Sequence, residues 1–229
     1  MSSPQVNHRL KATAAAALLI SFAAFGQEAD RANTEPQRSV KERTVISREL
    51  PKATFTVAKD FRLVGTQKVN LYGNADAEQY LFVKAGPHGT VDRFYWLQFE
   101  HFLPTNTYTY KYDQKHATRW GNIQFVYDIR SWPNFATLIA GDPASDGAAI
   151  TRLLAKHGLA FAQRTAMVRM FHLPTNDHRT ELMIIYGETL PQNSTTPVRE
   201  GGVELDTESP ASAETLLDHA KRGLIVQTL

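Results

Sequence analysis

The sequence contains no cysteine among its 229 residues. Disulfide bonds are therefore excluded, although an exported protein could form them. Zinc sites built from thiolates are excluded too, as is the lipid anchor that bacterial lipoproteins attach to a cysteine behind their leader. An ordinary hydrophobic core must therefore stabilise the fold.

Several motifs that carry chemistry are also missing. The chain has no Gly-x-Ser-x-Gly nucleophile motif, no phosphate-binding glycine loop and no dinucleotide-binding glycine pattern. None of its eight histidines belongs to the pair with an intervening glutamate that zinc hydrolases carry on a helix. The sequence therefore predicts no cofactor and no metal, and it leaves any catalytic residue unknown.

The N-terminus has the pattern of a secretory signal peptide over residues 1–26. Arg9 and Lys11 give this segment a positive charge, and its apolar run, 12–25, is too short to span a bilayer. Small residues precede the expected cleavage after Gly26. We therefore expect an exported protein, periplasmic or extracellular, without an integral membrane span once the leader is removed.

The sequence also has almost no excess of positive over negative charge. The whole chain carries a formal charge of +2, and Arg9 and Lys11 of the leader supply this excess. The mature chain is thus neutral and has no basic block of the kind that binds phosphate backbones. We expect no nucleic-acid partner and favour a small-molecule ligand; the sequence does not identify a protein partner.

Composition divides the chain behind the leader into four parts. We expect a polar tether over 27–52, a β-rich globular domain over 53–186, a flexible connector over 187–208, and a C-terminal helix with a docking tail over 209–229. A mature chain of about 200 residues suffices for one domain with its own core.

Short runs of alternating apolar and polar residues dominate the globular domain, which is typical of antiparallel strands. The clearest runs cover 61–72, 79–85, 91–103, 123–130, 167–172 and 181–186. One helix is expected to begin after a cap at Asp142-Pro143 or at Ser145 and to end at Gly158. The prediction is an α+β, β-rich fold with a single curved antiparallel sheet, one packed helix and a C-terminal helix; the alternative is a closed β-barrel.

The run 108–112 alternates tyrosine with threonine and lysine. On a strand, Tyr108, Tyr110 and Tyr112 would share one face. A tyrosine hydroxyl needs a hydrogen-bond partner, so this stripe fits a wet cavity or an exposed sheet face better than a dry core.

The densest aromatic segment is 94–102. On a strand, Trp96 shares one face with Glu100, while Tyr95 shares the other face with His101. Aromatic residues on both faces are typical of a central strand in a core, and they also suit the wall of a ligand pocket. The candidate ligand-binding residues are Tyr95, Trp96, His101, Tyr108, Tyr110, Tyr112 and Tyr127.

Three functions remain open on these grounds. The first is an exported soluble protein that binds a small, partly apolar ligand in an aromatic-lined pocket. The second is a hydrolase with His101 or His172 as base and a distant carboxylate, such as Glu100 or Asp92. The third is an envelope protein that binds a partner through its C-terminal helix. Whether the protein is an enzyme stays open.

Overall fold

The computed structural model describes residues 38–198, 203–204 and 213–229. The predicted signal peptide, the first part of the predicted tether and the start of the predicted C-terminal helix lie outside the described residues. Within the described ranges, no helix has the length and apolar character that a membrane crossing requires.

The described residues form mainly β-strands. The strands are β1 Ser39–Lys41, β2 Thr44–Ser47, β3 Ala53–Val57, β4 Arg62–Leu71, β5 Ala75–Ala85, β6 Thr90–Phe102, β7 Ala117–Trp120, β8 Ile123–Trp132, β9 Ala160–Phe161, β10 Thr165–His172, β11 Thr180–Thr189, β12 Val203–Glu204 and β13 Leu224–Thr228. The α-helices are α1 Phe135–Ala140, α2 Asp146–Lys156 and α3 Ala213–Gly223.

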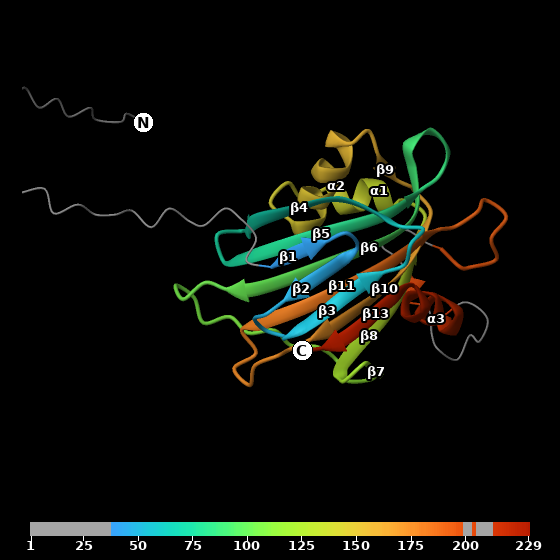
Figure 1. Ribbon diagram of the computed structural model, residues 1–229. Coiled ribbons are helices and arrows are strands. Elements are labelled where there is room, and N and C mark those ends of the chain that lie inside the picture. The colour runs from blue at the N-terminus through green and yellow to red at the C-terminus, as the bar shows by residue number, and fades with distance from the viewer. Residues whose placement is uncertain (1–37, 199–202, 205–212) are drawn as a thin grey trace, which may run out of the picture. The chain divides into compact units, whose positions relative to one another are not determined.

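The strands form two sheets. The small sheet has the order β1-β2-β3-β13, and the large sheet has the order β12-β8-β10-β11-β6-β5-β4, with β7 added to β8 and β9 added to β6. Figure 1 shows the small sheet lying over one face of the large sheet, with α1 and α2 near β4 and β5. Neighbouring strands are antiparallel except β6 and β9. The predicted β-rich α+β fold is confirmed, with two sheets in place of one, and neither closes into a barrel over the described residues.

The folded part begins before Ala53, the residue at which the sequence placed the domain boundary. Strand β1 pairs with β2, and β2 pairs with β3, so residues 39–47 belong to the small sheet. Val45 and Ser47 are fully buried there. The sequence indicated a possible short strand around 44–46, which is β2, but β1 and β2 are too short to give a sustained period within the polar segment 27–52.

Two hydrophobic cores lie on opposite faces of the large sheet. The core between the sheets includes Phe55 of the small sheet and Tyr80, Tyr95, Leu97, Phe125, Val168 and Ile184 of the large sheet. The core on the helical side includes Leu81, Phe94 and Trp96 of the large sheet with Ile150 and Leu154 of α2. Both faces of β6 are therefore buried, as the aromatic segment predicted for a central strand.

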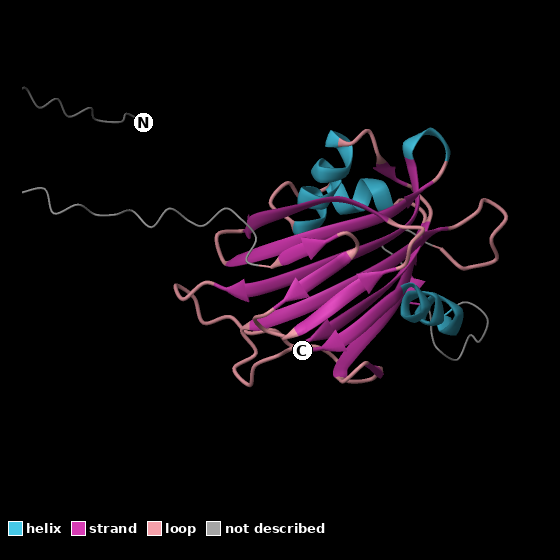
Figure 2. Ribbon diagram, viewed as in Figure 1, coloured by secondary structure: helices cyan, strands magenta, loops and turns pink. Residues whose placement is uncertain are grey.

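The two predicted helices have their expected positions in the chain. Ser145 caps α2, since its Oγ accepts a hydrogen bond from Ala148 N at 3.1 Å, and the left-handed Gly158 follows the helix. Figure 2 shows α3 apart from α1 and α2. The apolar stripe of α3 packs into the core between the sheets through Leu216 and Ala220. The apolar residues that follow form β13, which pairs with β3.

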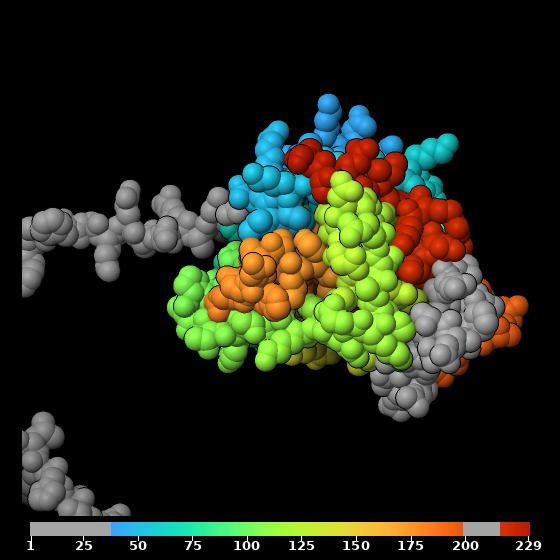
Figure 3. Space-filling view, turned by 90° about the horizontal axis from the view of Figure 1, so that it is seen from below, coloured from blue at the N-terminus to red at the C-terminus, as the bar shows by residue number. Residues whose placement is uncertain are grey.

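The predicted strand that carries the tyrosine stripe is wrong, because residues 103–116 form a loop. This loop is tied to the turn before β11: Tyr110 N donates to His178 O at 2.8 Å, and Arg179 donates to Tyr108 O at 3.0 Å. In Figure 3 the green surface of the loop lies against the orange surface of that turn. Alternation of residue types did not reveal that this segment has no neighbouring strand to pair with.

Candidate functional site

The helical face of the large sheet changes from apolar to polar along its central strands. Alternation places Trp96, Gln98 and Glu100 of β6 on this face, since their neighbours Tyr95 and Leu97 enter the other core. Where α1 and α2 pack, the face is apolar. Toward the end of β6 it carries an amide and then a carboxylate.

Strand register brings charged residues together on this polar part. Glu100 of β6 lies directly opposite Glu181 of β11, and Arg169 of β10 lies directly opposite Asp128 of β8. Directly opposite residues have Cβ atoms about 4.5–5.5 Å apart and point to the same face. Two glutamates therefore stand side by side in the middle of a sheet.

Two adjoining cavities occupy this face. The polar cavity, of about 290 Å³, is lined by Gln98, Glu100, Tyr110, Tyr112, Asp128, Asp146, Arg169, Phe171, Glu181 and Met183. The apolar cavity, of about 160 Å³, is lined by Trp96, Trp132, Phe135, Leu138, Ile139, Asp146, Gly147, Met167, Arg169, Met183 and Ile185. Asp146, Arg169 and Met183 line both cavities. We call the two together the cleft.

Three carboxyl groups of the cleft accept hydrogen bonds from neutral donors. Glu100 accepts from Tyr110 Oη at 2.6 Å and from Gln98 Nε2 at 2.7 Å. Asp146, the first residue of α2, accepts from Gly147 N at 2.7 Å and from Gln98 Nε2 at 3.4 Å. Glu181 accepts from the Tyr112 hydroxyl. The tyrosine loop 103–116 thus supplies one hydroxyl to each glutamate.

A row of glutamines fixes the orientation of these donors. Gln67 Nε2 donates to Gln79 Oε1 at 2.6 Å, and Gln79 Nε2 donates to Gln98 Oε1 at 2.8 Å. The amide oxygen of Gln98 is therefore already an acceptor, and its N–H groups face Glu100 and Asp146. The row runs across β4, β5 and β6 and ends at the carboxylates.

Burial and mutual repulsion shift the pKa values of these acids upward. Burial, with smaller contributions from the charges of Glu100 and Asp146, raises the pKa of Glu181 to about 8, against a lowering effect of the Tyr112 hydroxyl. Burial is also the main cause that raises the pKa of Glu100 and of Asp146, while the bonds from Gln98 act in the opposite direction. Glu181 therefore keeps its proton at neutral pH.

The cation of the cleft already has a partner. Arg169 Nε donates to Asp128 Oδ1 at 2.8 Å, and a second guanidinium nitrogen donates to Asp128 Oδ2. Such a two-bond pair holds the guanidinium firmly and neutralises its charge locally. Glu100, Asp146 and Glu181 form no ion pair within the described part of the chain.

The arrangement has two chemical capabilities. A protonated carboxyl opposite an ionised one can donate or accept a proton near neutral pH. The same groups can also hold a polar or charged ligand by hydrogen bonds. Among the described residues, no group of three or more histidines, aspartates and glutamates is placed to hold a metal ion.

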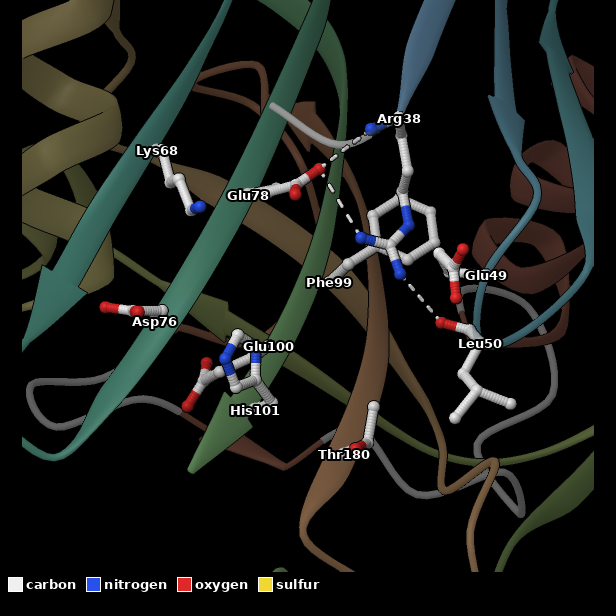
Figure 4. Close-up of a pocket in the computed structure, with 10 residues that line it drawn as sticks. All are labelled: Arg38, Glu49, Leu50, Lys68, Asp76, Glu78, Phe99, Glu100, His101 and Thr180. Atoms are coloured by element: carbon white, nitrogen blue, oxygen red, sulfur yellow. Dashed lines mark hydrogen bonds and ion pairs between the residues drawn. The ribbon is translucent and has the colours of Figure 1, made fainter. Parts of the chain in front are cut away.

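A second hollow, of about 150 Å³, lies where β1 and β2 approach β5 and β6, and Figure 4 shows its lining residues. Arg38 lies with its guanidinium 4.0 Å from the centre of the Phe99 ring. It forms an ion pair with Glu78 at 3.4 Å and donates to Leu50 O at 2.9 Å. This hollow therefore contains a buried acid with a cation beside it.

The structure brings three of the predicted ligand-binding residues to the cleft. Tyr110 and Tyr112 line its polar cavity, and Trp96 lines its apolar cavity. His101 lines the hollow of Figure 4 instead. Tyr108 is exposed, and its ring contacts Phe102.

Tyr95 and Tyr127 pack on the opposite face, toward the core between the sheets. The Tyr95 hydroxyl donates to Ala220 O at 2.7 Å, so this residue links the large sheet to α3. Tyr127 contacts the ring of His116. Neither tyrosine lines the cleft.

The two histidines proposed as bases also lie outside the cleft. His172 Nδ1 lies 2.9 Å from Gln124 O, and burial lowers the pKa of this histidine. His101 is exposed, and it projects from the opposite face of β6 to Glu100.

Sequence reasoning missed Glu181, Asp146 and Arg169. Asp146 resembles a helix-capping residue, although Ser145 is the cap. The available signal for the other two is a charge at an apolar position of a central strand: Glu181 shares its face with Met183 and Ile185. An ionisable residue in such a place needs either a partner or a function.

No protein-family model, curated protein or solved structure matches the chain. The functional argument therefore rests on the cleft.

Proposed function

We propose that the protein is exported and binds a small, partly apolar ligand in the cleft. The observation that carries this proposal is that the polar and apolar cavities share Asp146, Arg169 and Met183. A ligand could therefore place a polar group among the carboxyls and an apolar group beside Trp96. Sites for small molecules combine these two kinds of lining.

The polar cavity lowers the stability of the fold, and this supports a functional role for it. Burying a carboxyl without a compensating cation destabilises a fold, and an apolar residue at the same position usually would not. Glu181 is 2 % exposed, and burial raises its pKa to about 8. Ionisable groups perturbed in this way concentrate at functional sites.

Export is the part of the proposal that rests on the leader. A charged start, an apolar run shorter than a membrane span and small residues before the expected cleavage together favour a secretory signal. Because the chain has no cysteine, it cannot carry the cysteine-linked lipid anchor of bacterial lipoproteins.

Ligand binding can be tested with N-phenyl-1-naphthylamine, a dye that is neutral at pH 7 and fluoresces in apolar sites. Leu138 lines the apolar cavity from α1 and is half exposed, so Leu138→Trp should block the cavity without disturbing the core. Ile225→Trp is the matched control, because Ile225 is an exposed apolar residue of β13 in the small sheet.

We expect saturable dye binding by the wild type and by Ile225→Trp, with at least a tenfold loss of affinity in Leu138→Trp. Native mass spectrometry of the purified protein should detect any co-purified ligand that the dye displaces. Absence of saturable binding, or equal binding by all three proteins, would contradict the proposal.

A further inference from the structure

The polar cavity contains an excess of acid over base. Arg169 is its cation, and Asp128 neutralises that charge through two hydrogen bonds. Glu100, Asp146 and Glu181 remain, and all three accept hydrogen bonds from neutral groups. Among the residues that line this cavity, Arg169 is the one cation, so an organic cation could supply positive charge to the three remaining acids.

Aromatic rings surround the same space. The Tyr112 ring is stacked on Phe171, with ring centres 4.1 Å apart, and both rings line the polar cavity. Tyr110 lies beside them, stacked on Phe102 at 4.3 Å. Carboxylates combined with aromatic faces are the groups that recognise organic ammonium ions in proteins.

A second feature is the apolar cavity that adjoins the carboxyl groups. It shares Asp146 and Met183 with the polar cavity, and its walls include Trp96, Met167 and Ile185. An apolar chain attached to a cation at the carboxyl groups would be removed from water between these walls. The cleft therefore suits a ligand that has a charged end and an apolar end.

We propose that the ligand of the cleft is an amphiphilic organic amine. Its ammonium group lies among Glu100, Asp146 and Glu181, and its apolar part extends past Met183 to Trp96. This inference rests on the proposed function of the cleft and adds the chemical class of the ligand. It differs from recognition of a neutral or anionic amphiphile, which the carboxyl groups would not favour.

Amine binding is coupled to a proton. The groups that face Glu181 are Glu100 from β6, Asp146 from α2, Tyr110 and Tyr112 from the loop 103–116, and the Arg169–Asp128 pair from β10 and β8. Burial raises the pKa of both tyrosines, so they stay neutral. An ammonium ion favours the charged form of Glu181, so binding at neutral pH should release about one proton per amine.

Titration calorimetry with three probes of equal chain length tests this proposal. Hexylammonium, 1-hexanol and hexanoate carry the same apolar chain and differ in charge. Each is titrated at pH 7 in phosphate and in Tris, whose different ionisation enthalpies report the number of protons released. The variants are Glu181→Gln, Glu100→Gln and, as an exposed acid remote from the cleft, Glu42→Gln.

We expect hexylammonium to bind at least about tenfold more tightly than hexanol, and hexanoate to bind most weakly. Proton release should disappear in Glu181→Gln, and affinity for the amine should fall about tenfold in both cleft variants. Glu42→Gln should behave as the wild type. Raising the pH from about 6 to about 8 should strengthen amine binding, since Glu181 then loses its proton more readily.

Two results would overturn this inference while leaving the proposed function intact. The first is equal binding of the three probes. The second is dye binding that Leu138→Trp weakens, together with no binding of hexylammonium. Failure of the dye and of all three probes would instead overturn the proposed function itself.

Discussion

Glu78 and Glu181 are buried glutamates of the same large sheet, and they differ in what surrounds them. Glu78 is 4 % exposed, lies 3.4 Å from the Arg38 guanidinium and accepts a hydrogen bond from Tyr80 Oη at 2.9 Å. Glu181 is 2 % exposed, faces the carboxyl of Glu100 and accepts its hydrogen bond from Tyr112. One acid is paired with a cation and the other with a second acid.

This difference separates an acid that holds the fold together from the acid that we propose contacts a ligand. A carboxylate beside a guanidinium holds segments of the fold together, and here Arg38 also joins β2 through a hydrogen bond to Ser47 Oγ at 3.0 Å. A carboxyl that is buried opposite another carboxyl weakens the fold; burial and, to a smaller extent, the charge of Glu100 raise the pKa of Glu181. The position of the cation is therefore the reason why we propose Glu181, and not Glu78, as a ligand-binding acid.

The largest effect should follow from breaking the structural pair. Arg38→Met removes the charge beside Glu78 and should lower the free energy of unfolding by about 4 kcal/mol, because it leaves a buried carboxylate without its guanidinium. Urea denaturation measures this loss. Lys84→Met is the control, since its pair with Asp60 is exposed and worth about 0.5 kcal/mol. Equal losses in both variants would refute the structural role of Arg38.

Glu181→Gln should change the free energy of unfolding less than Arg38→Met does. At high pH the substitution should raise this free energy. The folded state binds the Glu181 proton more tightly than the unfolded state, so wild-type stability should fall as the pH rises from about 4.5 to about 8 and level off above. The decline from this residue between pH 5 and pH 9 is on the order of 4 kcal/mol. Urea unfolding from pH 5 to pH 9 should show a shallower decline in Glu181→Gln, which becomes the more stable protein above pH 8.

Glu42→Gln provides the reference for that pH series, because Glu42 is exposed in the β1–β2 turn. Its stability should follow the wild-type curve at every pH. If the stability of Glu181→Gln falls with pH as steeply as that of the wild type and of Glu42→Gln, Glu181 does not cause the decline.

The smallest effect should come from Tyr112→Phe. The Tyr112 hydroxyl stabilises the charged form of Glu181, so its removal should raise the pKa of that carboxyl further. Loss of one hydrogen bond should also cost about 1 kcal/mol of stability at pH 7. Carbon-13 NMR titration of the Glu181 carboxyl measures the pKa. Tyr108→Phe, at an exposed ring, should leave it unchanged; a shift of similar size there would argue against the direct contact.

Local patterns predicted the long strands β4, β5, β6, β8, β10 and β11 and the helix α2, because each of these patterns depends on neighbours in the chain. The apolar residues on both faces of 94–102 correctly indicated a central, buried strand, and Ser145 with Gly158 marked the ends of α2. The tyrosine stripe misled because alternation fixes the side on which a residue lies but not the presence of a hydrogen-bonded neighbour. Loop 103–116 is held instead by the turn before β11.

The site was harder to predict because it depends on strand order and register. Glu100 and Glu181 are far apart in sequence and meet only because β11 lies next to β6 in one particular register. Trp96, Tyr110 and Tyr112 were found through their aromatic character, which local sequence shows. Nothing local distinguishes Glu181 from an exposed strand acid except its apolar neighbours.

The strand β13 imposes an order on the assembly of the small sheet. It supplies the outer partner of β3 and places Leu224 and Val226 in the core between the sheets. The other described strands all precede β13 in the chain, so the core between the sheets can close only after residues 224–228 have joined β3. Until then β3 has an open edge that another chain could pair with. Deletion of residues 224–229 would leave that edge open permanently, with aggregation as the expected outcome.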